Sequence, residues 1–186
     1  MRFEASRMTF NGKENSMNNQ VVVGHVALIQ RSKKQWFTLE LLKALREKGY
    51  DAVGVFAGDC REPEYMDELN QSVEQYGLKG QVVFLGRRSD IPDLLKIIDM
   101  LIIPSAFEGV PLAGLEAAAV DVPVIACDAA GAEEFIRVSG DGVTFIEDDV
   151  VSAAEAVGKI LEGKECIKRL VLNLRTRCLT RNTLRG

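Results

Sequence analysis

Histidine is nearly missing from this sequence and cysteine is unclustered, which excludes several kinds of chemistry. The one histidine, His25, lies inside an apolar strand pattern. That position favours a structural role, and one histidine there supports neither a Ser/His/Asp triad nor a metal cluster. No Asp-x-Asp pair stands at a strand end, and Asp148-Asp149 is better explained as a helix cap, so we expect no bound metal. The cysteines form no Cys-x-x-Cys pair, which predicts free thiols in a reducing cytoplasm; they are Cys60, Cys127, Cys166 and Cys178.

Long apolar runs are missing as well. No run approaches the roughly 20 residues that span a bilayer. Residues 1–19 are polar and lack the apolar core of a secretory signal, so we expect a cytoplasmic protein. The chain has 186 residues, with 47% hydrophobic and 27% charged side chains. This is the composition of an ordinary globular protein, and the length suits one domain with its own core.

Charge is unevenly distributed along the chain. Residues 164–186 contain seven basic residues and one acidic residue, a net charge of +6, whereas residues 1–163 contain 16 basic and 26 acidic residues, a net charge of −10. We expect residues 164–186 to form a basic C-terminal helix or tail. Two interpretations stay open, namely a solvated or frayed segment, or contact with an anionic membrane surface on the cytoplasmic side.

Short apolar runs alternate with helix-period patterns along residues 21–163, after an Asn-rich stretch, residues 1–20, that predicts a flexible lead-in. This alternation is typical of an α/β protein with a single Rossmann-like, doubly wound parallel sheet of about six strands. The expected strands are 21–29, 52–57, 81–85, 100–103, 123–126 and 143–146. The expected helices are 36–48, 63–76, 90–98, one that begins at Pro111, 131–138 and 149–161.

Ligands of such sheets bind beyond the carboxyl ends of the strands, near the switch in strand order. The stretch from Pro104 to Ala119 follows an apolar strand at this rim and leads into an Ala/Leu-rich helix. It carries two carboxylates, Glu108 and Glu116. The first N–H groups of a new helix attract anions, and a carboxylate beside them accepts hydrogen bonds from sugar hydroxyls. We therefore expect a site for a phosphate and a sugar here.

The same stretch resembles a known family. Glu108-x7-Glu116, with Pro104-Ser105 before it, is similar to the signature of the family 4 nucleotide-sugar glycosyltransferases, which have the GT-B fold. Residues 122–136 resemble the next part of that family's pattern. The resemblance runs from about residue 21 to residue 163 and covers the family's second, donor-binding half. It implies a nucleotide-sugar-binding domain over residues 21–163.

The resemblance also implies roles for individual residues. Glu108 would lie near the donor sugar, and Glu116 would bind the ribose hydroxyls of the nucleotide. Loop 86–90 would meet the nucleotide base, mostly through backbone groups. The alternative is that the two glutamates are an exposed loop residue and a first-turn helix residue. The segment around the turn would contact phosphate or sugar, with candidate donors at Gly109, Val110, Leu112 and Ala113.

A basic loop follows the first strand. In the family a lysine in this loop binds the donor diphosphate, and Lys33 aligns with it, with Lys34 as the alternative. An arginine five residues before that lysine is common in the family, but Leu28 stands there. Arg31 could substitute for it from within the loop. The alternative is a solvated basic loop without a ligand.

By this resemblance the function is transfer of a hexosyl unit from a UDP-, GDP- or ADP-sugar, with retention of configuration, in polysaccharide or glycoconjugate synthesis. Lys33 and Glu108 would be the catalytic residues. A GT-B enzyme also needs an N-terminal acceptor-binding domain, so this chain alone is expected to transfer little sugar, and nucleic acid is not an expected partner. A non-catalytic nucleotide-binding module or regulatory subunit is the alternative, and half of a sugar-nucleotide epimerase is a weaker one.

Overall fold

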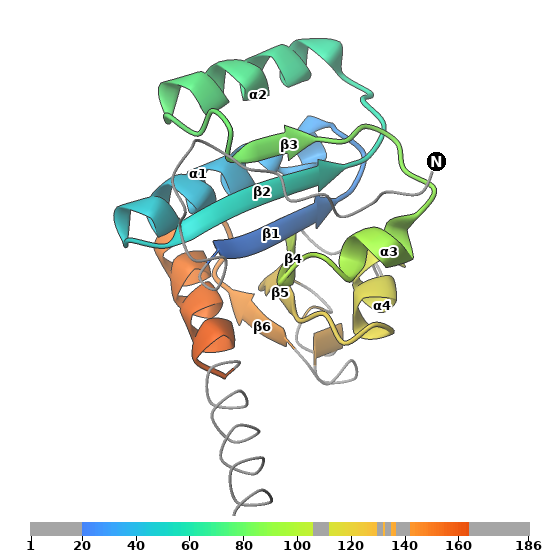
Figure 1. Ribbon diagram of the computed structural model, residues 1–186, viewed down its shortest axis with the longest axis vertical. Helices are drawn as coiled ribbons and strands as arrows, with labels where there is room; N and C mark the ends of the chain where they lie inside the picture. Colours follow the sequence, from blue (N-terminus) through green and yellow to red (C-terminus); the bar gives the residue numbers. More distant parts are fainter. Residues whose placement is uncertain (1–19, 106–111, 130–131, 133–134, 137–141, 164–186) are drawn as a thin grey trace, which may run out of the picture.

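The computed structural model describes residues 20–105, 112–129, 132, 135–136 and 142–163. They form one sheet of six parallel strands in the order β3-β2-β1-β4-β5-β6 (Figure 1). The predicted α/β class and six-stranded parallel sheet are confirmed. The strands are β1 (Gln20–Val26), β2 (Asp51–Ala57), β3 (Val82–Phe84), β4 (Met100–Ile103), β5 (Val124–Cys127) and β6 (Gly142–Phe145).

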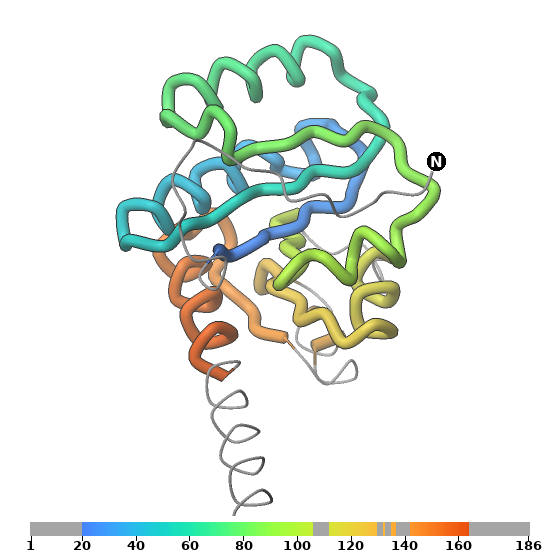
Figure 2. The backbone as a smooth tube through the Cα atoms, viewed as in Figure 1, coloured from blue at the N-terminus to red at the C-terminus, as the bar shows by residue number. Residues whose placement is uncertain are grey.

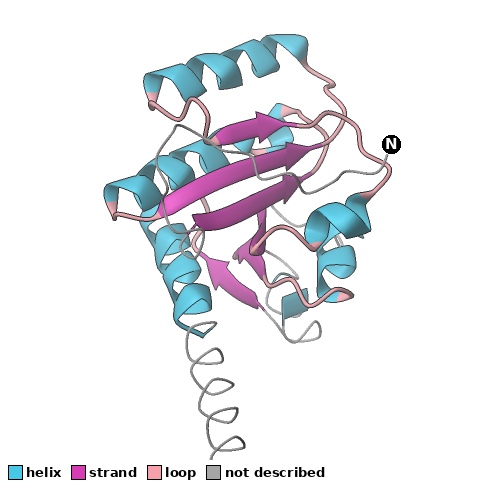
Figure 3. Ribbon diagram, viewed as in Figure 1, coloured by secondary structure: helices cyan, strands magenta, loops and turns pink. Residues whose placement is uncertain are grey.

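Helices lie on both faces of the sheet (Figure 3). Gly49 and Gly77, both with positive φ, follow the first two long helices. Residues 150–163 are also helical, and Asp149 caps them by accepting hydrogen bonds from the N–H groups of Val151 and Ser152. The other helices are η1 (Arg31–Lys33), α1 (Gln35–Glu47), α2 (Pro63–Gln75), α3 (Ile91–Leu95) and α4 (Leu112–Ala118).

The sheet separates two hydrophobic cores. Successive strand residues point to opposite faces. Met100 and Ile102 therefore join the core beneath α1, α2 and helix 150–163, whereas Leu101 joins the core beneath α3 and α4. Strands that are buried on both faces read as continuous apolar runs, which is why the sequence revealed β4 and β5. The sheet is thus doubly wound.

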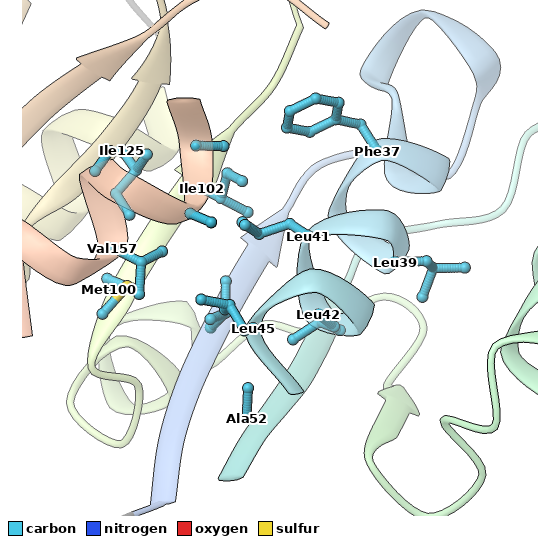
Figure 4. Packing of buried hydrophobic residues seen from close by; sticks show 14 of the residues in the cluster. Phe37, Leu39, Leu41, Leu42, Leu45, Ala52, Met100, Ile102, Ile125 and Val157 are labelled. Atoms are coloured by element: carbon cyan, nitrogen blue, oxygen red, sulfur yellow. The ribbon is translucent and has the colours of Figure 1, made fainter. Parts of the chain in front are cut away.

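The larger core anchors the beginning of α1. Leu41 of α1 points towards Ile102 of β4, and Val157 of helix 150–163 lies near Met100 (Figure 4). The ring of Phe37 stacks on the ring of Phe145, with centroids 5.2 Å apart and planes at 11°. This contact joins the first turn of α1 to the end of β6, and so it positions the loop that precedes α1.

Two local predictions were wrong. The first strand ends at Val26 and not at Ile29, although the N–H of Ala27 still donates to the carbonyl of Ala57. Pairing resumes only as a single bridge between Ile29 and Cys60. The helix expected over residues 90–98 spans only Ile91–Leu95, and Asp90 at its N-cap position makes no capping hydrogen bond, because its carboxylate binds Arg88 instead.

Several predictions fall outside the described residues. They include the lead-in, most of the predicted helix 131–138 and the basic tail, so contact of that tail with a membrane stays a prediction. Among the described helices, none combines the length and apolar character that crossing a bilayer requires.

Candidate functional site

The strand order creates a switch point between β1 and β4. From β1 the chain moves outward through β2 and β3, then returns to place β4 on the other side of β1 and continues outward to β6 (Figure 2). The connections leaving β1 and β4 therefore diverge, and in open α/β sheets the ligand crevice lies at this place. The predicted basic loop leaves β1 here, and the Glu-x7-Glu segment leaves β4.

The β4 side of this crevice is described only in part. Glu108, Gly109 and Val110 lie outside the described residues. On α4, Gly114 and Ala117 are buried against the sheet, whereas Leu112 is 76% exposed and Glu116 is also exposed. Leu112 and Glu116 are one helical turn apart, so they share the outward face of α4. Glu116 is thus free to accept hydrogen bonds from a ligand.

Arg31 is already paired on the β1 side. Its guanidinium donates to both carboxylate oxygens of Glu68, at 2.8 and 2.5 Å, and Glu62 lies 3.7 Å away. It also lies over the ring of Tyr65, 5.1 Å from the centroid. These carboxylates raise the pKa of Arg31, and the guanidinium in turn lowers the pKa of Glu68. Arg31 therefore binds the loop to α2.

Lys34 is also paired, but with carboxylates beyond β6 and not with those near α2. Its ammonium donates to Glu147 at 2.7 Å and to Asp148 at 2.8 Å, in the loop that follows β6. Its side chain is only 18% exposed. Lys34 and Asp148 both have positive φ, 53° and 54°, which is uncommon for residues other than glycine. The ion pair thus joins two turns whose unusual backbone needs support from the surrounding structure.

Lys33 differs from Arg31 and Lys34 in its pairing. Within the described ranges no ion pair or hydrogen bond of its ammonium is recorded, and its side chain is half-buried. Its charge is felt by His25, which is buried and within hydrogen-bond distance of Thr38, 2.9 Å from Nδ1 to Oγ1. The structural role predicted for His25 is confirmed. Of the three cations in this loop, Lys33 is the one whose charge has no recorded partner among the described residues.

His25 should make stability depend on pH. Burial, followed by the charge of Lys33, lowers the pKa of His25 from 6.5 to about 3. In the unfolded chain His25 binds a proton below about pH 6.5, whereas in the folded chain it binds one only near pH 3. Acid therefore favours unfolding across this window. Between pH 7 and 5 we expect His25 to lower the free energy of unfolding by about 2 kcal/mol. Denaturation at both pH values checks this, since His25→Gln should lose that part of the pH dependence; an equal loss in both proteins contradicts it.

A cavity adjoins the same loop. It has a volume of about 340 Å³ and lies beyond the carboxyl ends of β1, β2 and β3. The guanidinium of Arg88 is held there by both carboxylate oxygens of Asp90, whereas Arg87 has no recorded ion pair among the described residues. Sequence reasoning expected mostly backbone contacts from this loop and did not single out the arginines. The lining residues are Val26, Ala27, Leu28, Ala57, Gly58, Asp59, Arg61, Arg87, Arg88 and Ile91.

In the part of the chain that the structure describes, His, Cys, Asp and Glu side chains form no group of three that could bind a metal ion. The described site instead offers a free ammonium at the switch point, an exposed carboxylate on α4 and a cavity rich in guanidinium groups. Such a combination suits a ligand with anionic groups, hydroxyls and acceptor atoms.

Comparison with known families and relatives agrees with this chemistry. The family model described as "Glycosyl transferases group 1" matches residues 6–177. A putative glycosyltransferase of Bacillus subtilis, EpsF, is 29% identical over 162 residues, which are 84% of this chain and 41% of EpsF. An Escherichia coli UDP-Gal:alpha-D-GlcNAc-diphosphoundecaprenol alpha-1,3-galactosyltransferase is 30% identical over 149 residues, 78% of this chain and 38% of that enzyme. The chain thus spans about two fifths of the length of these curated relatives.

The fold is likewise similar to that of a solved structure. Anabaena HepE in complex with UDP and glucose superposes with a TM-score of 0.72 at 28% identity. The match covers 79% of this chain and 40% of HepE. The structural likeness therefore also spans one part of a longer protein.

Proposed function

The chain belongs to the group 1 glycosyl transferases, and we propose that it is the donor-binding half of such an enzyme, in a GT-B fold. The reaction is transfer of a hexosyl unit from a nucleotide diphosphate sugar, with retention of configuration, in polysaccharide or glycoconjugate synthesis. The HepE complexes with UDP and with UDP-glucose favour a uridine nucleotide as donor.

Lys33 carries this proposal, because among the described residues it is the cation of the β1 loop, at the switch point of the sheet, for which no partner is recorded. The bond between the anomeric carbon and the diphosphate oxygen breaks during transfer, and negative charge grows on the departing diphosphate. An ammonium fixed beside that oxygen stabilises the charge without reorganisation. Lys33 therefore acts on the leaving group, and the pair Arg31–Glu68 holds its loop on one side.

The carboxylates bind the sugars in this proposal. Glu116 accepts hydrogen bonds from the two ribose hydroxyls, which its exposed position on α4 permits. Leu112 and Ala113 border the same ligand at the beginning of α4. Glu108 acts near the transferred sugar, with Gly109 and Val110 beside it. Those last three assignments rest on the motif alone.

The acceptor requires further protein in this proposal. The curated relatives are more than twice as long as the matched segment, so we propose that an N-terminal acceptor-binding domain or subunit completes the enzyme. The acceptor hydroxyl then attacks the anomeric carbon as the bond to the diphosphate breaks, and its proton passes to the departing diphosphate. Without that partner the chain binds donor but turns it over slowly. The proposed place of action is the cytoplasm.

One observation favours a second candidate, a non-catalytic nucleotide-binding module. Leu28 stands where the family pattern has an arginine, and Arg31 is already held by Glu68. The diphosphate then meets one cation of this loop where two are usual. A single cation still supports binding, but it stabilises a leaving group less well.

Calorimetric titration of Glu116→Ala tests the ribose contact. The chain is titrated with UDP, GDP, ADP, UDP-glucose and GDP-mannose, and we expect one or two of them to bind saturably. Loss of a carboxylate that accepts two hydrogen bonds should weaken that binding about tenfold or more. Glu155→Ala removes another exposed carboxylate, from helix 150–163, and should change nothing. Unaltered binding in Glu116→Ala contradicts the ribose role, and no binding by the folded chain contradicts the donor-binding proposal.

A further inference from the structure

We propose that Gln35 is a positioning residue for the diphosphate, because its side-chain amide closes the β1 loop and holds Lys33 in place before the ligand arrives. The inference rests on the proposed function, since it needs a diphosphate beside Lys33. It adds a residue that the sequence pattern did not single out, and it assigns part of the order of the loop to one hydrogen bond. Gln35 itself makes no contact with the ligand in this proposal.

One side-chain hydrogen bond closes the β1 loop. Gln35 is the first residue of α1, and its Nε2 donates to the backbone carbonyl of Leu28 at 2.8 Å. Leu28 lies just beyond the end of β1, so the bond joins the two ends of the loop, and Lys33 lies inside the closed segment. The side chain of Gln35 is fully buried, and a hydrogen bond shielded from water is electrostatically stronger than an exposed one.

The helix end that carries Gln35 is itself anchored. The N–H of Trp36 donates to the hydroxyl of Tyr65 on α2 at 3.0 Å, and the first turn of α1 packs on the larger core. Within the loop, the N–H of Lys33 donates to the carbonyl of Gln30 at 2.9 Å. The amide of Gln35 therefore ties the start of a loop with its own short turn to a fixed helix end.

The amide oxygen of Gln35 is a cost to the fold. Its Oε1 is buried and has no recorded hydrogen-bond partner among the described residues. An unpaired buried acceptor lowers stability, whereas an apolar side chain of similar length fills the space without that penalty. The stability of the fold therefore does not account for a glutamine here, and what the amide contributes is its bond to Leu28.

A closed loop binds the diphosphate more tightly than an open one. Within the described ranges no ion pair of the Lys33 ammonium is recorded, so its position depends on the backbone that carries it. A loop that is already ordered loses less conformational freedom on binding. Loss of the Gln35 bond therefore adds an ordering cost to binding, and this cost matters only while Lys33 is present to contact the ligand.

Calorimetric titration of the full chain with UDP, GDP and ADP tests the inference. Gln35→Met keeps the length of the side chain without the amide, and we expect it to weaken the nucleotide that binds by about fivefold, the cost of ordering one side chain. Gln35→Leu, which also lacks the amide, should behave alike. The effect stays modest because the ion pairs of Arg31 and Lys34 also hold the loop.

Thr38→Val is the matched control. It removes a buried hydrogen bond to His25 from the same helix, 2.9 Å from Oγ1 to Nδ1. It should lower the unfolding temperature and leave the nucleotide affinity unchanged. Thermal unfolding confirms that each variant is folded before its titration is interpreted.

A double-mutant cycle with Lys33→Ala separates positioning from a general structural role. If Gln35 acts through Lys33, Gln35→Met weakens binding in the unmodified chain and causes no further loss in Lys33→Ala. An equal loss in both backgrounds overturns the inference, because Gln35 then acts on the site without Lys33. Full affinity in Gln35→Met overturns it as well and leaves donor binding intact. If the folded, unmodified chain binds none of the three nucleotides, both proposals fail.

Discussion

Replacement of Lys33 by alanine is expected to weaken the binding of every nucleoside diphosphate by about 10- to 150-fold, whichever base it carries. A hydrogen bond to a charged group contributes about 1.5–3 kcal/mol, which is this range of affinity. The folded structure loses little, because no ion pair of Lys33 is recorded among the described residues. We expect the free energy of unfolding to change by less than about 0.5 kcal/mol.

Lys34→Ala should lose stability but keep most of its affinity for nucleotide. Its ammonium joins Glu147 and Asp148 and is mostly shielded from solvent, so the variant should lose about 1 kcal/mol of stability. It should bind nucleotide more nearly as the unmodified chain does, since only the support of the loop is lost. The two variants remove the same charge from neighbouring positions, and each is therefore the control for the other.

Titration with UDP and urea denaturation of both variants provide the measurement. The single tryptophan, Trp36, lies in the first turn of α1 beside this loop and reports unfolding by its fluorescence. If Lys34→Ala abolishes binding while Lys33→Ala retains it, the ligand lysine is Lys34 and its ion pair must open on binding. If neither variant affects binding, the β1 loop is not the diphosphate site.

Sequence patterns predicted the fold, but they could not show which of Lys33 and Lys34 is held in an ion pair. The strands and helices follow from local signals, such as the apolar run Met100–Ile103 and the glycine that ends each long helix. Whether each cation of the loop is paired depends on carboxylates that are far along the chain. Glu68 is 37 residues from Arg31, and Glu147 is 113 residues from Lys34. The register of such distant loops is set by tertiary packing, which no local pattern contains.

The same reasoning explains the other differences. Asp90 has the residue type and position of a cap, but the guanidinium of Arg88 competes for its carboxylate. A charge-assisted, two-point contact is stronger than a hydrogen bond to a backbone N–H. The sequence identified loop 86–90 by resemblance, yet it could not show that Arg88 is fixed in a cavity. That property needs the neighbouring ends of β1 and β2 as well.

Gly58→Ala should cause the largest loss of stability among single methyl additions near the site. A Cβ at position 58 would lie 1.8 Å from the backbone oxygen of Ala27 and 2.5 Å from its carbonyl carbon. Because both atoms belong to the backbone, no side chain can turn aside, and the ends of β1 and β2 must separate. This strains the hydrogen bond from Ala27 to Ala57 and the one from Gly58 to Gly86, at 3.0 and 2.9 Å. We expect a loss of about 3 kcal/mol, at the upper end of the usual cost of overpacking.

Gly158→Ala adds the same methyl group with the opposite expected sign. A Cβ at position 158 meets nothing within 4 Å, and the residue lies inside helix 150–163. Alanine is a better helix former than glycine by about 1 kcal/mol, so this variant should be more stable. Urea denaturation followed by Trp36 fluorescence should therefore separate the two variants by about 4 kcal/mol.

The two glycine variants also test the link between strand ends and ligand. Gly58 lines the cavity beyond β1, β2 and β3, and Ala27 begins the loop that carries Lys33. Separation of these strand ends moves that cavity relative to the ammonium of Lys33, so folded Gly58→Ala should bind UDP and GDP more weakly even at a temperature where it is fully native. Gly158→Ala should bind as the unmodified chain does. Full affinity in Gly58→Ala would mean that the close packing of β1 on β2 serves stability alone, and that the cavity and the loop of Lys33 adjust to the nucleotide independently.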